Sequence, residues 1–315
     1  MTTTAETRRE VITTVINEVR RKRAVAEFPA ELQATRIDSW FVGRGSWPVG
    51  APERLTLLQR LEAEFPQLED SATGTRVTIG VASGADKIFV INDRDCIESS
   101  RLLPLAMASD VASGQLEWSG HYLVNPWEDD GLIVLDAYPR LKAYFERHAV
   151  QLKNRHIAKK RPDSWYRTID RVGITLAAKP KLYIPDTKKR LFPVLDGGET
   201  YPHHNLYVIV ADSWDLEILG GLLLSDIAQF FVESYAVRMR GGYLRFQAQY
   251  LRKIRIPRPD QIDTVQAERL REAFHQRDVK MATLIACQLY GLPAWPPNEV
   301  PVTKLATTSL DLPRF

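Results

Sequence analysis

A basic segment that runs into two aromatic residues has the side chains needed to hold a phosphate backbone beside a stacking surface. The segment contains four cations and an aromatic pair: Arg155, Lys159, Lys160, Arg161, Trp165 and Tyr166. Lysine and arginine neutralise phosphates and release condensed counterions, while rings and guanidinium planes stack. The spacing therefore indicates a nucleic-acid surface, and packing of Trp165 in the core is the structural alternative.

A second basic segment surrounds two adjacent glycines. Arg240, Gly241 and Gly242 allow the main chain to approach a groove closely, because glycine carries no Cβ. Arg245 follows, and the fork of an arginine matches the edge of guanine in the major groove. We expect this segment to approach DNA together with Phe246, for which core packing is again the alternative.

A glycine-containing turn near the start of the chain is a third candidate. Gly80, Ser83 and Gly84 precede Lys87 within the sequence GVASGADK. The two glycines favour a turn and the close passage of a neighbour or a ligand. Lys87 fits a phosphate contact or an ordinary surface lysine equally well.

The basic residues are concentrated in these parts of the chain. Residues 140–190 contain fifteen Lys/Arg and four Asp/Glu, and residues 238–258 contain seven Lys/Arg and no acid, although the net charge is only +3. Such asymmetry suits a polyanion bound on one face, with solvated helix surface as the alternative.

Catalytic and metal-ligating patterns are not found. His203 and His204 are adjacent, and neighbouring side chains on a strand point to opposite faces, so we expect no metal site there. Two cysteines, Cys96 and Cys287, are too few for a zinc cluster or a disulfide framework. We therefore assign no catalytic and no metal-binding residue.

The elements that must position these residues alternate irregularly between strands and helices, which indicates an α+β domain with a mixed sheet and flanking helices. We expect helices at 6–27, 52–65, 138–155, 215–237 (after caps at 212–213) and a helix or helix pair within 261–290. We expect strands at 77–79, 87–91, 121–124, 132–135, 181–184, 206–210 and 252–256. A composition of 44% hydrophobic and 26% charged residues, without a long apolar run or a secretion signal, predicts a cytoplasmic protein that does not span a membrane.

Short blocks in a characteristic order give the chain a family resemblance. They are IGVASGADKIFVI (79–91), HYLVNP (121–126), YPRLKAYF (138–145), LKNR (152–155) before Trp165-Tyr166, KPKLYIP (179–185), LGGLLLS (219–225), GGYLRF (241–246), LRKIRIP (251–257) and LYGL (289–292). Over residues 55–290 the chain resembles the TaqI-like specificity domain, the C-terminal target-recognition half of type II and type IIG adenine methyltransferases. Ser83 departs from the threonine that the family usually has.

The resemblance implies sequence-specific recognition of double-stranded DNA without methyl transfer by these residues. The catalytic loop of the family, Asp/Asn/Ser-Pro-Pro-aromatic, holds a flipped adenine. Asn125-Pro126-Trp127-Glu128 lacks the second proline and the aromatic residue, and the glycine motif at 41–45 leads into no βαβ unit. We expect no Rossmann methyltransferase domain and no cofactor in this chain. We expect S-adenosylmethionine to bind to a catalytic partner subunit or to a missing domain.

The sequence therefore predicts three parts: a connecting or docking segment (1–52), a DNA target-recognition domain (53–260), and a C-terminal helical segment with a loose tail (261–315). Two alternatives stay open. The chain could be an inactive remnant, or a protein-interaction module of phage defence that reuses the fold.

Overall fold

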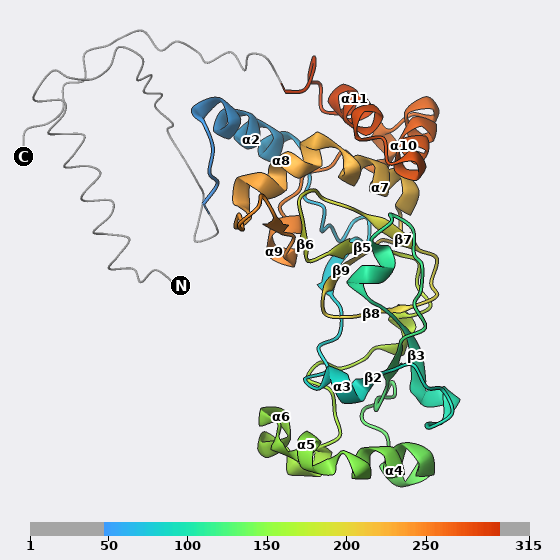
Figure 1. Ribbon diagram of the computed structural model, residues 1–315. Helices are drawn as coiled ribbons and strands as arrows, with labels where there is room; N and C mark the ends of the chain where they lie inside the picture. Colours follow the sequence, from blue (N-terminus) through green and yellow to red (C-terminus); the bar gives the residue numbers. More distant parts are fainter. Residues whose placement is uncertain (1–46, 297–315) are drawn as a thin grey trace, which may run out of the picture. The chain divides into compact units, whose positions relative to one another are not determined.

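The computed structural model describes residues 47–296 (Figure 1). The chain divides into two compact units, Met1–Val42 and Gly43–Phe315, and all described residues belong to the second. The helix expected at 6–27 lies outside them. Within residues 47–296, no helix has both the length and the apolar character that crossing a membrane requires.

The first sheet has four antiparallel strands, and its two central strands are buried on both faces. In spatial order the strands are β1 (Arg76–Ile79), β9 (Leu206–Val210), β5 (Lys181–Pro185) and β7 (Val194–Asp196). Along β9, Tyr207 and Ile209 face the main core, while Leu206 and Val208 face a smaller core on the other side. This explains the uninterrupted apolar run of β9, since a strand covered on both faces needs no polar side. The predictions for β1, β5 and β9 are confirmed.

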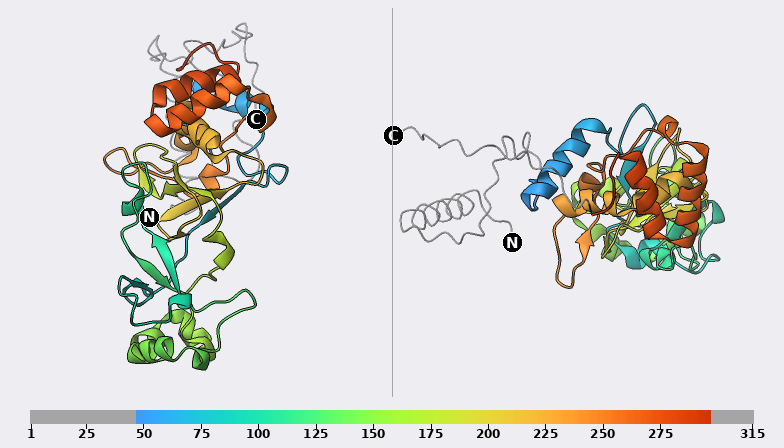
Figure 2. Two further views of the ribbon diagram at one scale, coloured as in Figure 1. Left: turned by 90° about the vertical axis from the view of Figure 1, so that its right-hand side faces the viewer. Right: turned by 90° about the horizontal axis from the view of Figure 1, so that it is seen from above.

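Helices cover one face of this sheet (Figures 1 and 2). They are α2 (Pro52–Glu64), α7 (Leu216–Leu224), α8 (Asp226–Tyr235), α10 (Thr264–Gln276) and α11 (Val279–Leu289). The single helix predicted at 215–237 is wrong, because the backbone leaves the helical region at Ser225 (ψ 157°). The Ser225 hydroxyl accepts a hydrogen bond from the Ala228 amide and caps α8.

Two glycines allow α7 and α10 to pack closely. A Cβ on Gly220 would lie 2.5 Å from the Phe274 ring, and one on Gly221 would lie 2.4 Å from the Leu270 carbonyl oxygen. The helix or helix pair expected within 261–290 is present as the two helices α10 and α11, and both pack in the main core. The cap of α7 is Asp215, not residues 212–213, because its carboxylate accepts from the first amides of the helix.

The second sheet is mixed and smaller. Its strands, in spatial order, are β2 (Val90–Ile91), β4 (Tyr122–Val124), β3 (Leu102–Ala106) and β8 (Tyr201–Pro202). Strands β3 and β8 pair in parallel, and the other pairs are antiparallel. The expectation of a mixed α+β architecture is confirmed for the described residues, with the strands divided between separate sheets.

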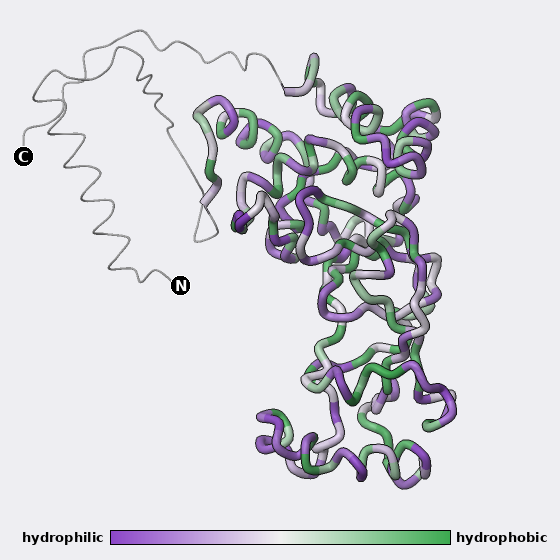
Figure 3. Tube along the Cα trace, viewed as in Figure 1, coloured by the Kyte–Doolittle hydropathy of each residue, from purple (hydrophilic) through white to green (hydrophobic). Residues whose placement is uncertain are grey.

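Three helices lie along the chain between strands β4 and β8 of the second sheet: α4 (Pro139–Arg147), α5 (Ala149–Asn154) and α6 (His156–Lys160). Leu141, Phe145 and Leu152 bury their side chains in the core of this sheet. The helix predicted at 138–155 is thus interrupted at His148, and the backbone is extended at Arg155 (ψ 145°) before α6 begins. Hydrophilic residues predominate from the end of α5 through α6 (Figure 3).

Three strand predictions need correction. Residues 86–89 form the helical turn α3 (Asp86–Phe89), which buries the consecutive residues Ile88 and Phe89, so β2 keeps only two residues. Strands β1 and β2 belong to different sheets. Residues 132–135 and 252–256 make isolated bridges only, at Leu132 and Arg255. Residues 86–89 bury two consecutive side chains, which an alternating strand does not do. Ile254 and Ile256 are buried at a spacing of two, yet only Arg255 makes a bridge, so this spacing alone does not establish a strand.

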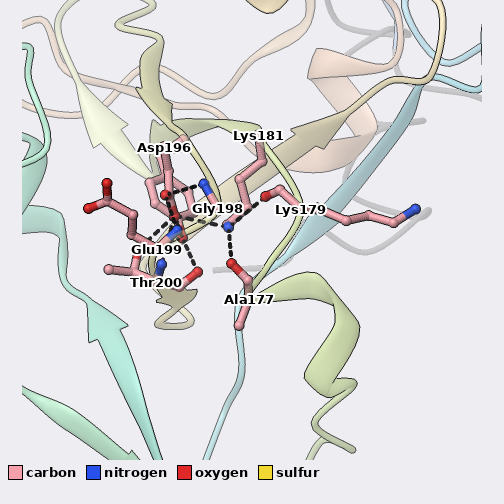
Figure 4. Close-up of polar contacts among 8 residues, drawn as sticks. Ala177, Lys179, Lys181, Asp196, Gly198, Glu199 and Thr200 are labelled. Carbon is pink, nitrogen blue, oxygen red and sulfur yellow. Dashed lines mark hydrogen bonds and ion pairs between the residues drawn. The ribbon is translucent and has the colours of Figure 1, made fainter.

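A buried ion pair braces the first sheet (Figure 4). Lys181 Nζ lies 2.9 Å from Asp196 Oδ2, and both side chains have 0% exposure. Lys181 also donates to the carbonyls of Ala177 and Lys179. Burial raises the pKa of Asp196, but hydrogen bonds from the Glu199 amide, Thr200 and Lys181 outweigh it and lower the pKa overall. The pair is fully satisfied, as a buried pair must be to be tolerated.

Candidate nucleic-acid interface

Residues 238–245 form an exposed turn that we call the basic hairpin. Arg238 and Leu244 make an antiparallel bridge, and the Met239 amide donates to the Tyr243 carbonyl at 2.8 Å. Gly241 and Gly242 have φ values of 82° and 80°, which residues with a Cβ rarely adopt. The predicted glycine turn is therefore required by the backbone of the hairpin.

The basic hairpin is joined to another basic segment. Its strand β10 (Leu244–Arg245) pairs with β6 (Thr187–Lys188), and Lys189 Nζ lies 5.6 Å from the centre of the Tyr243 ring. Arg240 is exposed, and Tyr243 is 41% exposed. The structure thus brings cations from two distant parts of the sequence to one place.

Arg245 and Phe246 differ from the rest of this segment. Arg245 Nη2 lies 2.5 Å from Asp186 Oδ2, and this hydrogen bond raises the pKa of Arg245. Phe246 has 0% exposure and packs in the main core. The candidate DNA contact at Phe246 is corrected to a core position, because a fully buried ring offers no face to a base.

Arg155 is half-buried among main-chain carbonyls. Its guanidinium donates to Leu152, Ser83, Trp165 and Arg167 at 2.8–3.1 Å. Burial lowers the pKa of Arg155. Most of its five donors are occupied, so the geometry favours bracing of these loops over base contact.

The neighbours of Arg155 divide into exposed and packed groups. Lys159, Lys160 and Arg161 are exposed at the end of α6. Trp165 is half-buried with Lys153 Nζ 4.9 Å from the centre of its ring. The hydroxyl of half-buried Tyr166 donates to the Ile133 carbonyl, and burial raises its pKa. The three cations can reach a phosphate, while the two rings stabilise their own loop.

The turn at 80–87 packs against the protein itself. A Cβ on Gly80 would lie 2.2 Å from the His203 carbonyl oxygen, so this glycine serves a close passage of two chain segments. Ser83 is 2% exposed. Gly84 (φ 75°) and Lys87 are exposed. The close approach inferred from the glycines is therefore to a neighbouring segment, and Lys87 is accessible for a phosphate.

A hollow of about 400 Å³ lies between this turn and α6. Its lining consists of Gly84, Arg155, His156, Ile157, Lys160 and Ile169. The exposed Ile169 (47%) gives it an apolar wall, and Lys160 gives it a cationic edge. The structure thus brings together Gly84, Arg155 and Lys160 from the predicted set, at a place separate from the basic hairpin in sequence.

The two adjacent histidines are closer together than a strand would allow. His203 is the last bridged residue after β8, and His204 lies in the turn that leads to β9. Their ring centres are 4.0 Å apart, and Asp86 lies beside both. The argument that the side chains point to opposite faces is wrong, because the turn reorients His204.

Sequence reasoning missed two features that bear on binding. Lys188 pairs with the hairpin at Leu244 and Lys189 lies over the Tyr243 ring, and their signal was the KKR run directly after a strand. The grouping of Asp86 with His203 and His204 had no signal in the sequence, since 117 positions separate Asp86 from His203.

Comparison with protein families places most of these residues in one domain. Residues 136–256 match the model of the TaqI-like C-terminal specificity domain. The range includes α6, β6 and the basic hairpin, and it begins after the blocks at 79–91 and 121–126. The TaqI-like resemblance is confirmed for residues 136–256.

Curated relatives are type II methyltransferases. M.BstVI of Geobacillus stearothermophilus is 43% identical over 264 residues, which are 83% of this chain and 47% of that enzyme. M.XhoI of Xanthomonas vasicola is 45% identical over 252 residues, which are 79% of this chain and 46% of that enzyme. The chain therefore spans about half the length of the curated relatives it matches.

A solved structure shares the fold. The type IIL restriction-modification enzyme MmeI, determined in complex with DNA, superposes with a TM-score of 0.53 at 12% identity. The match covers 79% of this chain and 35% of that chain. The second compact unit thus has the fold of part of a restriction-modification enzyme.

Proposed function

Because residues 136–256 form a TaqI-like C-terminal specificity domain, we propose that this protein recognises DNA sequence for an adenine-specific DNA methyltransferase of a restriction-modification system. The observation that carries the proposal is the position of the basic hairpin inside the matched range. A domain of this family with an open, arginine-bearing turn has the groups that contact phosphates and base edges.

The contacts divide between the two basic surfaces. Arg238 and Arg240 on the hairpin are exposed, so their donors can enter a groove. Lys159, Lys160 and Arg161 are exposed at the end of α6 and supply phosphate contacts that fix the register of the duplex. Lys87 adds a further phosphate contact.

Methyl transfer belongs to a catalytic domain outside these 315 residues, on a partner subunit or on another part of a longer protein. The match covers only about half of each relative's length, and the Pro-Pro-aromatic loop is missing from this sequence; both observations support this division. That domain binds S-adenosylmethionine and the flipped adenine, while this chain supplies the sequence preference.

The test is selection from a random-sequence duplex library at two salt concentrations, followed by sequencing of the bound fraction. Enrichment of one short motif with a steep salt dependence is the expected result, since each phosphate contact contributes about 0.9 to the slope of log K against log salt. Binding of every duplex equally, with no enriched motif, would contradict sequence recognition by this chain.

A second candidate function is docking of a protein partner through the hairpin. Val237, Met239 and Tyr243 are 60%, 45% and 41% exposed, an apolar group that a protein surface can cover. This alternative would be favoured if the unchanged chain bound no DNA but bound a protein independently of the salt concentration.

A further inference from the structure

Three metal-ligating side chains converge where α3 meets the turn between β8 and β9. His203 Nε2 lies 3.1 Å from Asp86 Oδ2, and His204 Nδ1 lies 4.0 Å from the same oxygen. One ligand atom from each residue falls within 4.8 Å of the other two. Within residues 47–296, this is the group of three such residues that the fold assembles.

The carboxylate is held so that one oxygen faces the two imidazoles. Ser83 Oγ donates to Asp86 Oδ1 at 2.5 Å and accepts from the Ala85 amide at 3.0 Å. Asp86 Oδ2 is thereby directed to the histidines. An outer partner that orients a ligating carboxylate is a regular feature of metal sites.

The two histidines differ in exposure, as expected for a metal site with one buried and one solvent-facing side. His203 has a side-chain exposure of 6%, and its main chain is fixed by hydrogen bonds to Ala106 and Leu206. His204 and Asp86 have exposures of 45% and 44%. One ligand is therefore rigid, two can adjust, and the exposed side leaves room for water or another oxygen ligand.

We propose that Asp86, His203 and His204 bind a divalent cation of the zinc class. Two imidazole nitrogens and one carboxylate suit Zn²⁺, Co²⁺ or Ni²⁺, whereas Mg²⁺ and Ca²⁺ take oxygen ligands. Ligand atoms around tetrahedral Zn²⁺ lie about 3.4 Å apart, and those of this group lie within 4.8 Å of one another, so binding requires a shift of at most about 1.4 Å. The half-exposed His204 can make this shift by side-chain rotation.

The ion would add a link between two segments that otherwise meet in the isolated bridge between Val81 and His203. It ties Asp86, the first residue of α3, to the β8–β9 turn. Ser83 orients Asp86 through its hydroxyl, and its carbonyl accepts a hydrogen bond from Arg155. Metal binding therefore stabilises the turn at 80–87 and its contact with Arg155. The site is separate from the basic hairpin and does not depend on the proposed DNA recognition.

The experiment is a calorimetric titration of the tag-free chain with Zn²⁺, repeated with Co²⁺ and read by its visible absorption. We expect one equivalent of metal per chain. His204→Ala and Asp86→Asn should each weaken binding by at least roughly tenfold, the smallest loss typical of even an outer-shell change. Both side chains are half-exposed, and circular dichroism verifies that the variants fold.

The matched control is His275→Ala. His275 Nε2 lies 3.1 Å from Glu217 Oε2, so it forms one histidine–carboxylate pair without a third ligand. This variant should bind Zn²⁺ as the unchanged chain does. No saturable binding by the unchanged chain, or binding that both site variants retain at full strength, would overturn the proposal.

Discussion

Arg155 and Arg240 occupy similar sequence surroundings and opposite physical situations. Each lies in a basic segment that also contains aromatic residues, Trp165 and Tyr166 in one and Tyr243 in the other. The Arg155 guanidinium is held by carbonyls from four residues, whereas Arg240 is exposed at the tip of a hairpin. When the donors of an arginine are bonded to carbonyls of the same protein, the side chain holds loops in place. An arginine exposed to solvent keeps its donors available for a ligand.

The glycines beside them show the same difference. Gly84 has φ 75°, and a Cβ there would lie 2.7 Å from Ile169 Cδ1. Gly242 has φ 80°, and a Cβ there would meet nothing within 4 Å. Residue type and spacing are therefore insufficient to identify a binding surface. Whether nearby carbonyls and side chains already contact the residue determines whether it is available to a ligand.

Lys181→Met tests a cation whose hydrogen bonds are all made inside the fold, in the buried pair with Asp196. Removing the lysine leaves Asp196 charged and fully buried, so the free energy of unfolding should fall by about 3–5 kcal/mol in urea denaturation. Lys179→Met is the control, since Lys179 is exposed and contributes only its carbonyl to the pair. Equal stability of the two variants would contradict the role given to the ion pair.

Arg155→Ala should destabilise the fold by about 2–3 kcal/mol, because carbonyls of Ser83, Trp165 and Arg167 lose a charged donor. Chemical denaturation measures the change. Lys159→Ala, on the exposed surface of α6, should change stability by less than about 0.5 kcal/mol. A stable Arg155→Ala chain with impaired DNA binding would instead assign Arg155 to the interface.

Arg238→Ala combined with Arg240→Ala should weaken DNA binding by about 1–2 kcal/mol and leave unfolding unchanged, because both side chains are exposed. Fluorescence anisotropy against salt concentration gives the affinity, and its slope should become shallower by about 0.9 for each phosphate that is no longer neutralised. Arg269→Ala, on the exposed face of α10, serves as the control. The account fails here if the control and the double variant bind DNA equally.

Gly84→Ala and Gly242→Ala form a pair with similar backbone strain. Both place a Cβ on a residue with positive φ, which costs about 1–2 kcal/mol. Only Gly84→Ala also displaces a side chain, Ile169, so thermal denaturation should show an additional loss of about 1 kcal/mol. A larger loss at Gly242 would mean that the hairpin is packed and not open.

Much of the fold could be predicted from the sequence where one periodicity dominated. The helices α2, α10 and α11, and the strands β1, β5 and β9, have apolar patterns that agree with their surroundings. The predictions for 86–89 and 215–237 were wrong. Residues 86–89 were predicted as part of a strand but form a helical turn. Residues 215–237 were predicted as one helix but form two, which are separated at Ser225. A local pattern does not show where a cap interrupts a helix.

The candidate site could be predicted in composition but not in geometry. The glycine turn at 241–242 and the exposed cations of α6 follow from residue type. The burial of Phe246 and the carbonyls around Arg155 depend on segments far away in sequence. The meeting of Asp86 with His204 likewise depends on the path of the whole chain.

The most direct test of the central claim is sequence selection by two chains in parallel, the unchanged protein and the variant with Arg238→Ala and Arg240→Ala. The unchanged chain should enrich one motif, and the variant should lose preference at part of that motif while its fold remains intact. If both chains enrich the same motif with the same affinity, the basic hairpin does not recognise DNA sequence and the account is wrong.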